Sequence, residues 1–201
     1  MKSYVSLPVG YQPSEQLDLL HNRRQLILVT VLNLVITVLM IAGAVLRGHA
    51  IHFSSLGMGN FLLKVFLCLA GIALYMVLHE LVHGLVIALC GAKPFYGFGG
   101  GYAYAGSKSY FSRVAYIGIA LAPVILWGIV LALLLPLLPE GWFWVGYLIQ
   151  VMNIGGAAGD YYVTVRILGM PADTLVQDTG IAMSFFTRTK LPDEPPAEYQ
   201  H

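Results

Sequence analysis

The sequence predicts an all-α membrane protein with about four transmembrane helices. Of its 201 residues, 58% are hydrophobic and only 10% are charged, which is typical of integral membrane proteins. Several apolar runs reach the roughly 20 residues that a helix needs to cross the hydrocarbon of a bilayer. The apolar composition predicts membrane lipid as the surrounding medium, and the formal net charge of +1 gives no argument for nucleic acid or an acidic protein as a partner.

The first element is a polar segment, residues 1–24, which contains no secretory signal and is expected to stay in the cytoplasm. The first transmembrane helix is expected over residues 25–46. Within it, Asn33 and Thr37 lie four residues apart and therefore share one helical face. We interpret them as groups that hydrogen-bond to a neighbouring helix, without a role in chemistry.

The following connection, residues 47–60, contains two histidines three residues apart. His49 and His52 would share a face if this stretch were helical, and they could then resemble half of a metal site. The glycines of the connection argue against a helix. Both histidines are therefore expected to be ordinary loop residues.

The second transmembrane helix, residues 61–90, carries the most informative motif. His79, Glu80 and His83 interrupt an otherwise nearly unbroken apolar run, and ionisable groups at membrane depth are costly and usually mark function. Because the histidines are four residues apart, one helical face can offer both imidazoles to a single ion. This is the HExxH spacing of zinc peptidases, whose glutamate is the general base for a zinc-bound water.

A glycine- and aromatic-rich connection, residues 91–112, separates the second helix from the third. Tyr102 and Tyr104 alternate with small residues as they would in a strand, which predicts a β-hairpin. The hairpin either re-enters the membrane or lies at its interface. If it re-enters, its free edge could bind an extended peptide by strand addition.

The third helix is expected over residues 114–138, with Pro123 inside it, and the fourth begins at Trp142, which fits a membrane-interface anchor. The transmembrane domain would thus cover residues 25–168. Lysines and arginines are concentrated in the segments that four crossings assign to one side. By the positive-inside rule we expect a multi-pass protein of the cell membrane with both termini in the cytoplasm.

Asp160 is a second ionisable group in a predicted membrane helix, and Asn153 lies nearly two turns before it on the same face. Both His79 and Asp160 lie about 27 Å from the outer ends of their helices, at the rise of an α-helix. Because a catalytic zinc site needs a third protein ligand, Asp160 is the candidate. The alternative is an interfacial aspartate that caps a helix or pairs with Arg166. Asn153 could bind the substrate or the developing oxyanion; otherwise it joins helices.

The C-terminal part, residues 169–201, is polar and is expected to be a cytoplasmic tail that is disordered at its end. Its Asp178-Thr179-Gly180 run spells the triplet of aspartic proteases. That chemistry requires paired aspartates in a β-rich lobe, which about thirty residues cannot supply. We therefore interpret the triplet as a turn between short segments.

The HELVHG run at residues 79–84 and the glycine-rich run from Asn153 to Asp160 resemble a bacterial membrane family of unknown function described as zincin peptidases, over about residues 60–185. More distantly, they resemble the site-two intramembrane metalloproteases. Those proteases usually have a proline in the second run and one more residue between its asparagine and aspartate. The resemblance implies a zinc peptidase of the cytoplasmic membrane with two histidines and Asp160 as ligands and Glu80 as base.

The sequence therefore predicts a membrane-embedded zinc metallopeptidase that hydrolyses a peptide bond in a peptide or membrane-protein substrate. The expected cofactor is Zn²⁺, held by His79, His83 and Asp160, with Glu80 and Asn153 as catalytic residues. Two alternatives stay open. A metal sensor or carrier would bind metal without forming a Glu80-dependent product, and a structural protein with a degenerate HExxH site would bind no stoichiometric metal.

Overall fold

The structure is a computed structural model that describes residues 3–18, 22–49, 58–99, 102–180 and 182–188. Its helices are α1 (Arg23–Leu46), α2 (Met58–Leu89), α3 (Arg113–Leu134), η1 (Leu135–Leu137), η2 (Glu140–Trp142), α4 (Phe143–Gly156) and α5 (Ala158–Leu168). Its strands are β1 (Ser3–Tyr4), β2 (Tyr11–Leu17), β3 (Pro94–Gly99), β4 (Tyr102–Ser107), β5 (Tyr110–Ser112), β6 (Leu175–Asp178) and β7 (Met183–Arg188). The predicted disordered end of the tail lies outside the described residues.

Three helices are long and apolar enough to cross a membrane: Arg23–Leu46, Gly59–Leu89 and Arg113–Leu137. Their positions agree with the first three predicted crossings, and they indicate a membrane protein. Many of their leucines and valines are exposed on the outside of the bundle, as expected where lipid replaces protein contacts. The fourth crossing is not confirmed, because α4 and α5 are two short helices that meet at Ala157. The count of four crossings stays a prediction.

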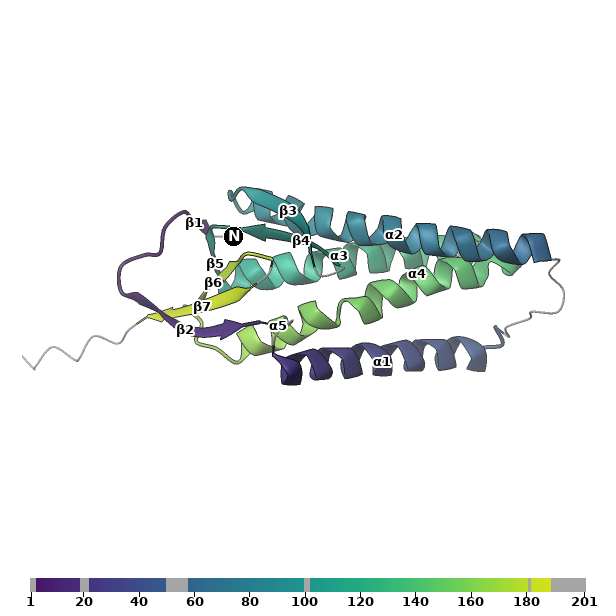
Figure 1. Cartoon of the computed structure of the whole chain (residues 1–201), viewed down its shortest axis with the longest axis horizontal. Coiled ribbons are helices and arrows are strands. Elements are labelled where there is room, and N and C mark those ends of the chain that lie inside the picture. Colours follow the sequence, from purple (N-terminus) through teal and green to yellow (C-terminus); the bar gives the residue numbers. More distant parts are fainter. Residues whose placement is uncertain (1–2, 19–21, 50–57, 100–101, 181, 189–201) are drawn as a thin grey trace, which may run out of the picture.

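The expectation of an all-α fold is wrong, because a five-stranded antiparallel sheet covers one end of the helical bundle (Figure 1). Its strand order is β1-β5-β6-β7-β2, so segments near both ends of the chain pair with each other. The longest pairing aligns Tyr11 with Arg188 and Leu17 with Met183. The N-terminal segment and the start of the tail are thus parts of one sheet.

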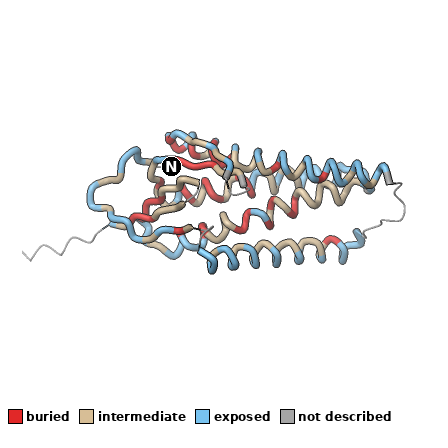
Figure 2. Tube along the Cα trace, in the orientation of Figure 1, coloured by how far each residue is buried: buried red, intermediate tan, exposed pale blue. Residues whose placement is uncertain are grey.

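The main hydrophobic core lies where this sheet meets the helices, and Figure 2 shows that buried residues gather at this end of the molecule. Leu17, Phe111 and Phe185 from the sheet are at most 1% exposed. They belong to the same cluster as Ala115 and Ile167, from α3 and α5. Burying one such large side chain stabilises the fold by about 1.5–3 kcal/mol, so the sheet is held firmly on the bundle.

The predicted β-hairpin is confirmed. β3 pairs with β4 in an antiparallel register from Pro94 opposite Ser107 to Gly99 opposite Tyr102, and both strands lie against α2. The hairpin forms a separate two-stranded sheet, so in the described residues one edge of β4 has no partner strand. At Gly106, an added Cβ would lie 2.7 Å from the backbone carbon of Thr179. The hairpin therefore meets the β6–β7 turn at close backbone distance.

Helix α1 lies beside α4 and α5 (Figure 1). The contact is close at Gly155, where an added Cβ would lie 2.9 Å from the Thr37 hydroxyl oxygen and 3.6 Å from the Asn33 carbonyl oxygen. Thr37 donates a 3.3 Å hydrogen bond to the Asn33 side chain. These two polar residues thus lie at a helix contact, as predicted, but they bond to each other within α1.

Candidate metal centre

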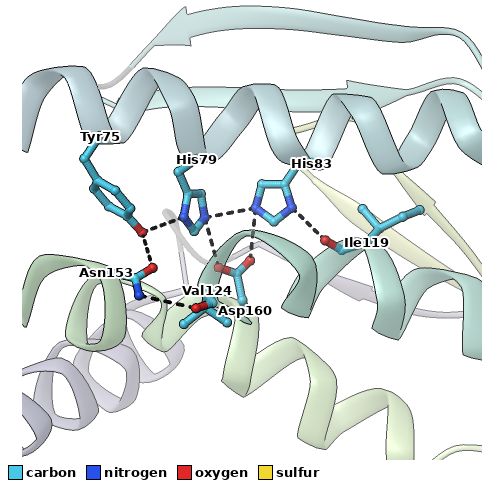
Figure 3. A network of polar contacts seen from close by, with 7 residues as sticks. All are labelled: Tyr75, His79, His83, Ile119, Val124, Asn153 and Asp160. Carbon is cyan, nitrogen blue, oxygen red and sulfur yellow. Dashed lines mark hydrogen bonds and ion pairs between the residues drawn. The ribbon is translucent and has the colours of Figure 1, made fainter. Parts of the chain in front are cut away.

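The three predicted metal ligands lie together (Figure 3). Helix α2 presents His79 and His83 on one face, with 3.1 Å between their Nε2 atoms. Helix α5 presents Asp160, whose Oδ2 is 3.4 Å from Nε2 of His79 and whose Oδ1 is 3.6 Å from Nε2 of His83. The side chains are largely buried, with 11–23% of their surface exposed.

The spacing of these donor atoms suits a tetrahedral zinc ion. Zinc binds imidazole nitrogen and carboxylate oxygen at about 2.0–2.2 Å, so two ligand atoms of a tetrahedron lie about 3.3–3.6 Å apart. The two Nε2 atoms lie 3.1 Å apart, Oδ2 of Asp160 lies 3.4 Å from His79, and Oδ1 lies 3.6 Å from His83. One donor atom from each residue can be chosen so that all three lie within 4.8 Å of one another. Two imidazoles and one carboxylate are also a donor set that catalytic zinc sites use, with a fourth position left for water or substrate. The residues present therefore fit the ion.

The orientation of His83 is fixed by a proline on the neighbouring helix. Pro123 lies inside α3 and has no N–H, so the carbonyl of Ile119, four residues earlier, lacks its helical donor. Nδ1 of His83 lies 2.9 Å from that carbonyl oxygen. Because a carbonyl only accepts, Nδ1 carries the proton and Nε2 presents its lone pair to Asp160 and His79. Pro123 thus leaves a backbone acceptor that positions a candidate metal ligand.

Asp160 reaches the histidines because the helix breaks before it. Helix α4 ends at Gly156, the chain turns at Ala157, and α5 begins at Ala158, so Asp160 lies in the first turn of α5. Gly155, Gly156 and Gly159 surround the break, and each glycine costs a helix about 1 kcal/mol relative to alanine. The first turn of α5 thus presents the carboxylate of Asp160 to the two histidines.

Asn153 does not reach the cavity. It is 0% exposed, and all of its polar atoms are bonded within the protein. Its Oδ1 accepts a 2.9 Å hydrogen bond from Tyr75, and its Nδ2 lies 3.3 Å from the Val124 carbonyl and 3.4 Å from Oε1 of Gln150. Tyr75 was missed at the sequence level, although it stands four residues before His79 on the same helical face.

A cavity of about 460 Å³ adjoins the three ligands and Glu80. Glu80 follows His79 on α2, and its carboxylate accepts a hydrogen bond from the backbone N–H of Ala105 in β4. Met76 and Met152 also line the cavity, as do residues of α1, β4 and the β6–β7 turn. Among the described residues, no lysine or arginine lines the cavity, so its charged groups are carboxylates.

One of these carboxylates, Asp178, was predicted only as part of a turn. It ends β6, and the chain does turn there before β7. Its Oδ2 accepts a hydrogen bond from the hydroxyl of Tyr116, and its Oδ1 accepts one of 2.7 Å from the backbone N–H of Gly180. Burial raises the pKa of Asp178 above its ordinary value, against the lowering effect of both hydrogen bonds. No local signal in the sequence could have placed it beside Glu80.

His49, the described member of the other histidine pair, takes no part in this site. Its ring stacks on Phe143 with 3.7 Å between ring centroids, near the end of the bundle that lies away from the sheet. His52 lies outside the described residues.

A family-model match covers residues 72–175, just over half of the chain, and the family is described as "Putative zincin peptidase". The chain belongs to this zincin peptidase family. A search of curated proteins and a search of solved structures each find no match. The matched region of this zincin-family protein contains His79, Glu80, His83 and Asp160, so the cluster lies in the part of the chain that defines the family.

Proposed function

We propose that this protein is a membrane-embedded zinc metallopeptidase that hydrolyses a peptide bond. The observation that carries the proposal is the arrangement of His79, His83 and Asp160, whose donor atoms all lie within 4.8 Å of one another beside a cavity that also contains Glu80. Membership of the zincin family supports the same reaction. The spacing, the donor types and the neighbouring carboxylate all suit a hydrolytic zinc site.

In this proposal the residues of the chain have separate roles. His79, His83 and Asp160 hold the ion, which when bound polarises the scissile carbonyl and lowers the pKa of a coordinated water. Glu80 takes the proton of the attacking water and gives it to the leaving amine. Its hydrogen bond from the Ala105 N–H points the carboxylate towards the cavity, so the base is held in place before the substrate binds.

The proposed substrate is an extended peptide segment, free or part of a membrane protein. Ala103, Tyr104 and Ala105 of β4 line the cavity, and among the described residues β4 pairs with a strand on one side only. Backbone groups on such an edge can hold an extended chain by strand addition, next to the Ala105 N–H that already bonds Glu80. Because the cavity lies between apolar helices and the sheet, we propose that cleavage occurs at the cytoplasmic side of the cell membrane, with four crossings and both termini in the cytoplasm.

The test compares the wild type with Glu80→Gln, purified in detergent and loaded with zinc. A peptide library that includes apolar, membrane-type segments is incubated with each protein, and the products are identified by mass spectrometry. Glu80→Gln should bind zinc as the wild type does but lose turnover by at least 100-fold, since it removes the general base. Glu15→Gln, which changes a carboxylate paired with Arg166 outside the cavity, is the matched control and should keep full activity.

The two other functions give different results in the same experiment. A metal sensor or carrier would bind zinc in both proteins and form no Glu80-dependent product. A structural protein with a degenerate site would carry no stoichiometric zinc. Full activity of Glu80→Gln would also refute the proposed mechanism.

A further inference from the structure

A chain of hydrogen bonds runs behind His79, on the side of the ring away from Asp160 (Figure 3). Nδ1 of His79 lies 2.8 Å from the hydroxyl oxygen of Tyr75, and that hydroxyl lies 2.9 Å from Oδ1 of Asn153. Tyr75 is 6% exposed and Asn153 is 0% exposed. These hydrogen bonds therefore connect a candidate metal ligand on α2 to a buried side chain of α4.

The donor in each of these hydrogen bonds can be derived by starting from Asn153. Asn153 lies 3.3 Å from the Val124 carbonyl, which can only accept a hydrogen bond, so the NH₂ group of the amide must point there. The amide oxygen of Asn153 consequently points at Tyr75 and must receive a proton. Tyr75 has one hydroxyl proton, and this bond uses it. The remaining neighbour, Nδ1 of His79, must therefore donate to the hydroxyl oxygen of Tyr75.

We propose that Tyr75 and Asn153 are positioning residues that hold His79 as the tautomer protonated at Nδ1. In this tautomer Nε2 carries a lone pair that points at Asp160 and at Nε2 of His83. Hydrogen bonds to the other ring nitrogen generally orient metal-binding histidines, and their loss typically costs 10- to 100-fold in metal affinity. We call the hydrogen bonds from Asn153 through Tyr75 to His79 the relay. In this relay the buried amide of Asn153 sets the orientation of His79 although it does not contact the proposed metal position.

The inference rests on the metal centre proposed above, in which the two Nε2 atoms lie 3.1 Å apart. His83 carries a proton on Nδ1 because of its bond to Ile119, so with both hydrogen bonds in place each neutral imidazole has its lone pair on Nε2. Two lone pairs and a carboxylate then face one point. These groups repel one another unless a proton or a metal cation lies between them.

The first measurement is the tautomer of His79 in the metal-free wild type, by NMR of protein labelled with ¹⁵N in histidine and assigned through His79→Gln. Nδ1–H is expected, and Nε2–H as the main form would overturn the proposal. This readout does not need bound metal or turnover. If His79 is protonated at Nδ1 but no zinc binds, the relay stands and the proposed metallopeptidase fails.

The second measurement is zinc affinity in three variants. Tyr75→Phe should lower it 10- to 100-fold, because Nδ1–H of His79 loses its acceptor. Asn153→Leu should lower it by at least 10-fold for a different reason. Without Asn153 the Tyr75 proton turns to Nδ1 of His79, which moves the histidine proton to Nε2, where the metal would bind.

The double variant separates this relay from a structural effect. In the Tyr75→Phe background there is no hydroxyl proton to redirect, so Asn153→Leu should cost less than 2-fold more. Additive losses would overturn the proposal. Tyr147→Phe is the packing control, because it deletes a tyrosine hydroxyl on α4 that bonds the Met40 carbonyl at 2.8 Å; its zinc affinity should equal that of the wild type. If Asn153→Leu does not fold, the tautomer of His79 in Tyr75→Phe decides, since a wild-type population of Nδ1–H there would refute the relay.

Discussion

Replacing Pro123 by alanine should weaken zinc binding although the residue lies on a helix that supplies no ligand. The alanine brings an N–H that points at the Ile119 carbonyl, because that is its partner four residues earlier in α3. At present His83 uses this carbonyl through a 2.9 Å contact. The new N–H shares the acceptor, so Nδ1–H of His83 is held less firmly and its Nε2 is less well directed.

The expected size of the effect is modest, because a carbonyl oxygen has two lone pairs and the bond is shared instead of lost. Zinc affinity should fall about 10-fold, the low end for loss of a hydrogen bond to a metal-binding histidine, which equals about 1.4 kcal/mol. Pro123 is fully buried, so deleting its ring removes packing of about 1.6 kcal/mol. The restored backbone hydrogen bond offsets about 0.5–1.5 kcal/mol of this, so the fold should survive.

The assay is competitive zinc titration of the purified protein against a chromophoric chelator at constant pH. Val124→Ala is the control, because it also loses packing on the same turn of α3 but leaves the Ile119 carbonyl free for His83. Its zinc affinity should stay within 2-fold of the wild type. Equal zinc affinities of Pro123→Ala and the wild type would refute the role given to the proline. Equal losses of affinity in Pro123→Ala and Val124→Ala would show that the effect comes from lost packing alone.

Three further predictions concern the rest of the structure. Gly155→Ala should lower the stability by about 1–3 kcal/mol, because its Cβ would come within 2.9 Å of the Thr37 hydroxyl. In thermal unfolding, Gly43→Ala should show no such loss, since it has nothing within 4 Å. In the metal-free protein, burial raises the folded-state pKa of Asp178, so its contribution to stability falls as pH rises from the unfolded value near 3.9 through the folded value. Asp178→Asn should therefore gain stability relative to the wild type over this window, and melting curves at a series of pH values measure this difference; a difference that does not change with pH would contradict it. Adding zinc at 100 times its Kd should raise the Tm of the wild type by roughly 5–10 °C, and a chelator should reverse the rise; an unchanged Tm would argue against a folded-state metal site.

The sequence predicts much of the helical part because the signals there are local. Long apolar runs mark α1, α2 and α3, and the four-residue spacing of His79 and His83 places both rings on one face. Asp160 was predicted from its depth and position in a glycine-rich segment, and the structure brings it within 3.6 Å of both histidines. The helices and the paired histidines depend on local helical geometry, whereas Asp160 follows the break at Ala157 and its place depends on how α5 lies relative to α2.

The sheet and the finer parts of the site depend on contacts between distant residues. β2 pairs with β7 across the whole chain, from Tyr11 opposite Arg188, and Pro13 within β2 weakens its strand pattern. The break at Ala157 was missed because glycine-rich stretches also occur inside packed membrane helices. The bonds from Tyr75 to Asn153 and from His83 to Ile119 cross between helices, and only the folded chain shows which acceptor each ring nitrogen meets.

The most direct test of the account is the zinc content of the purified protein, measured by plasma mass spectrometry beside Asp160→Ala. The account predicts about one zinc per wild-type chain and a loss of most of it in the variant, because the third ligand of the centre is removed. A wild type that takes up no zinc, or an Asp160→Ala protein that retains it in full with unchanged affinity, would contradict the proposed centre.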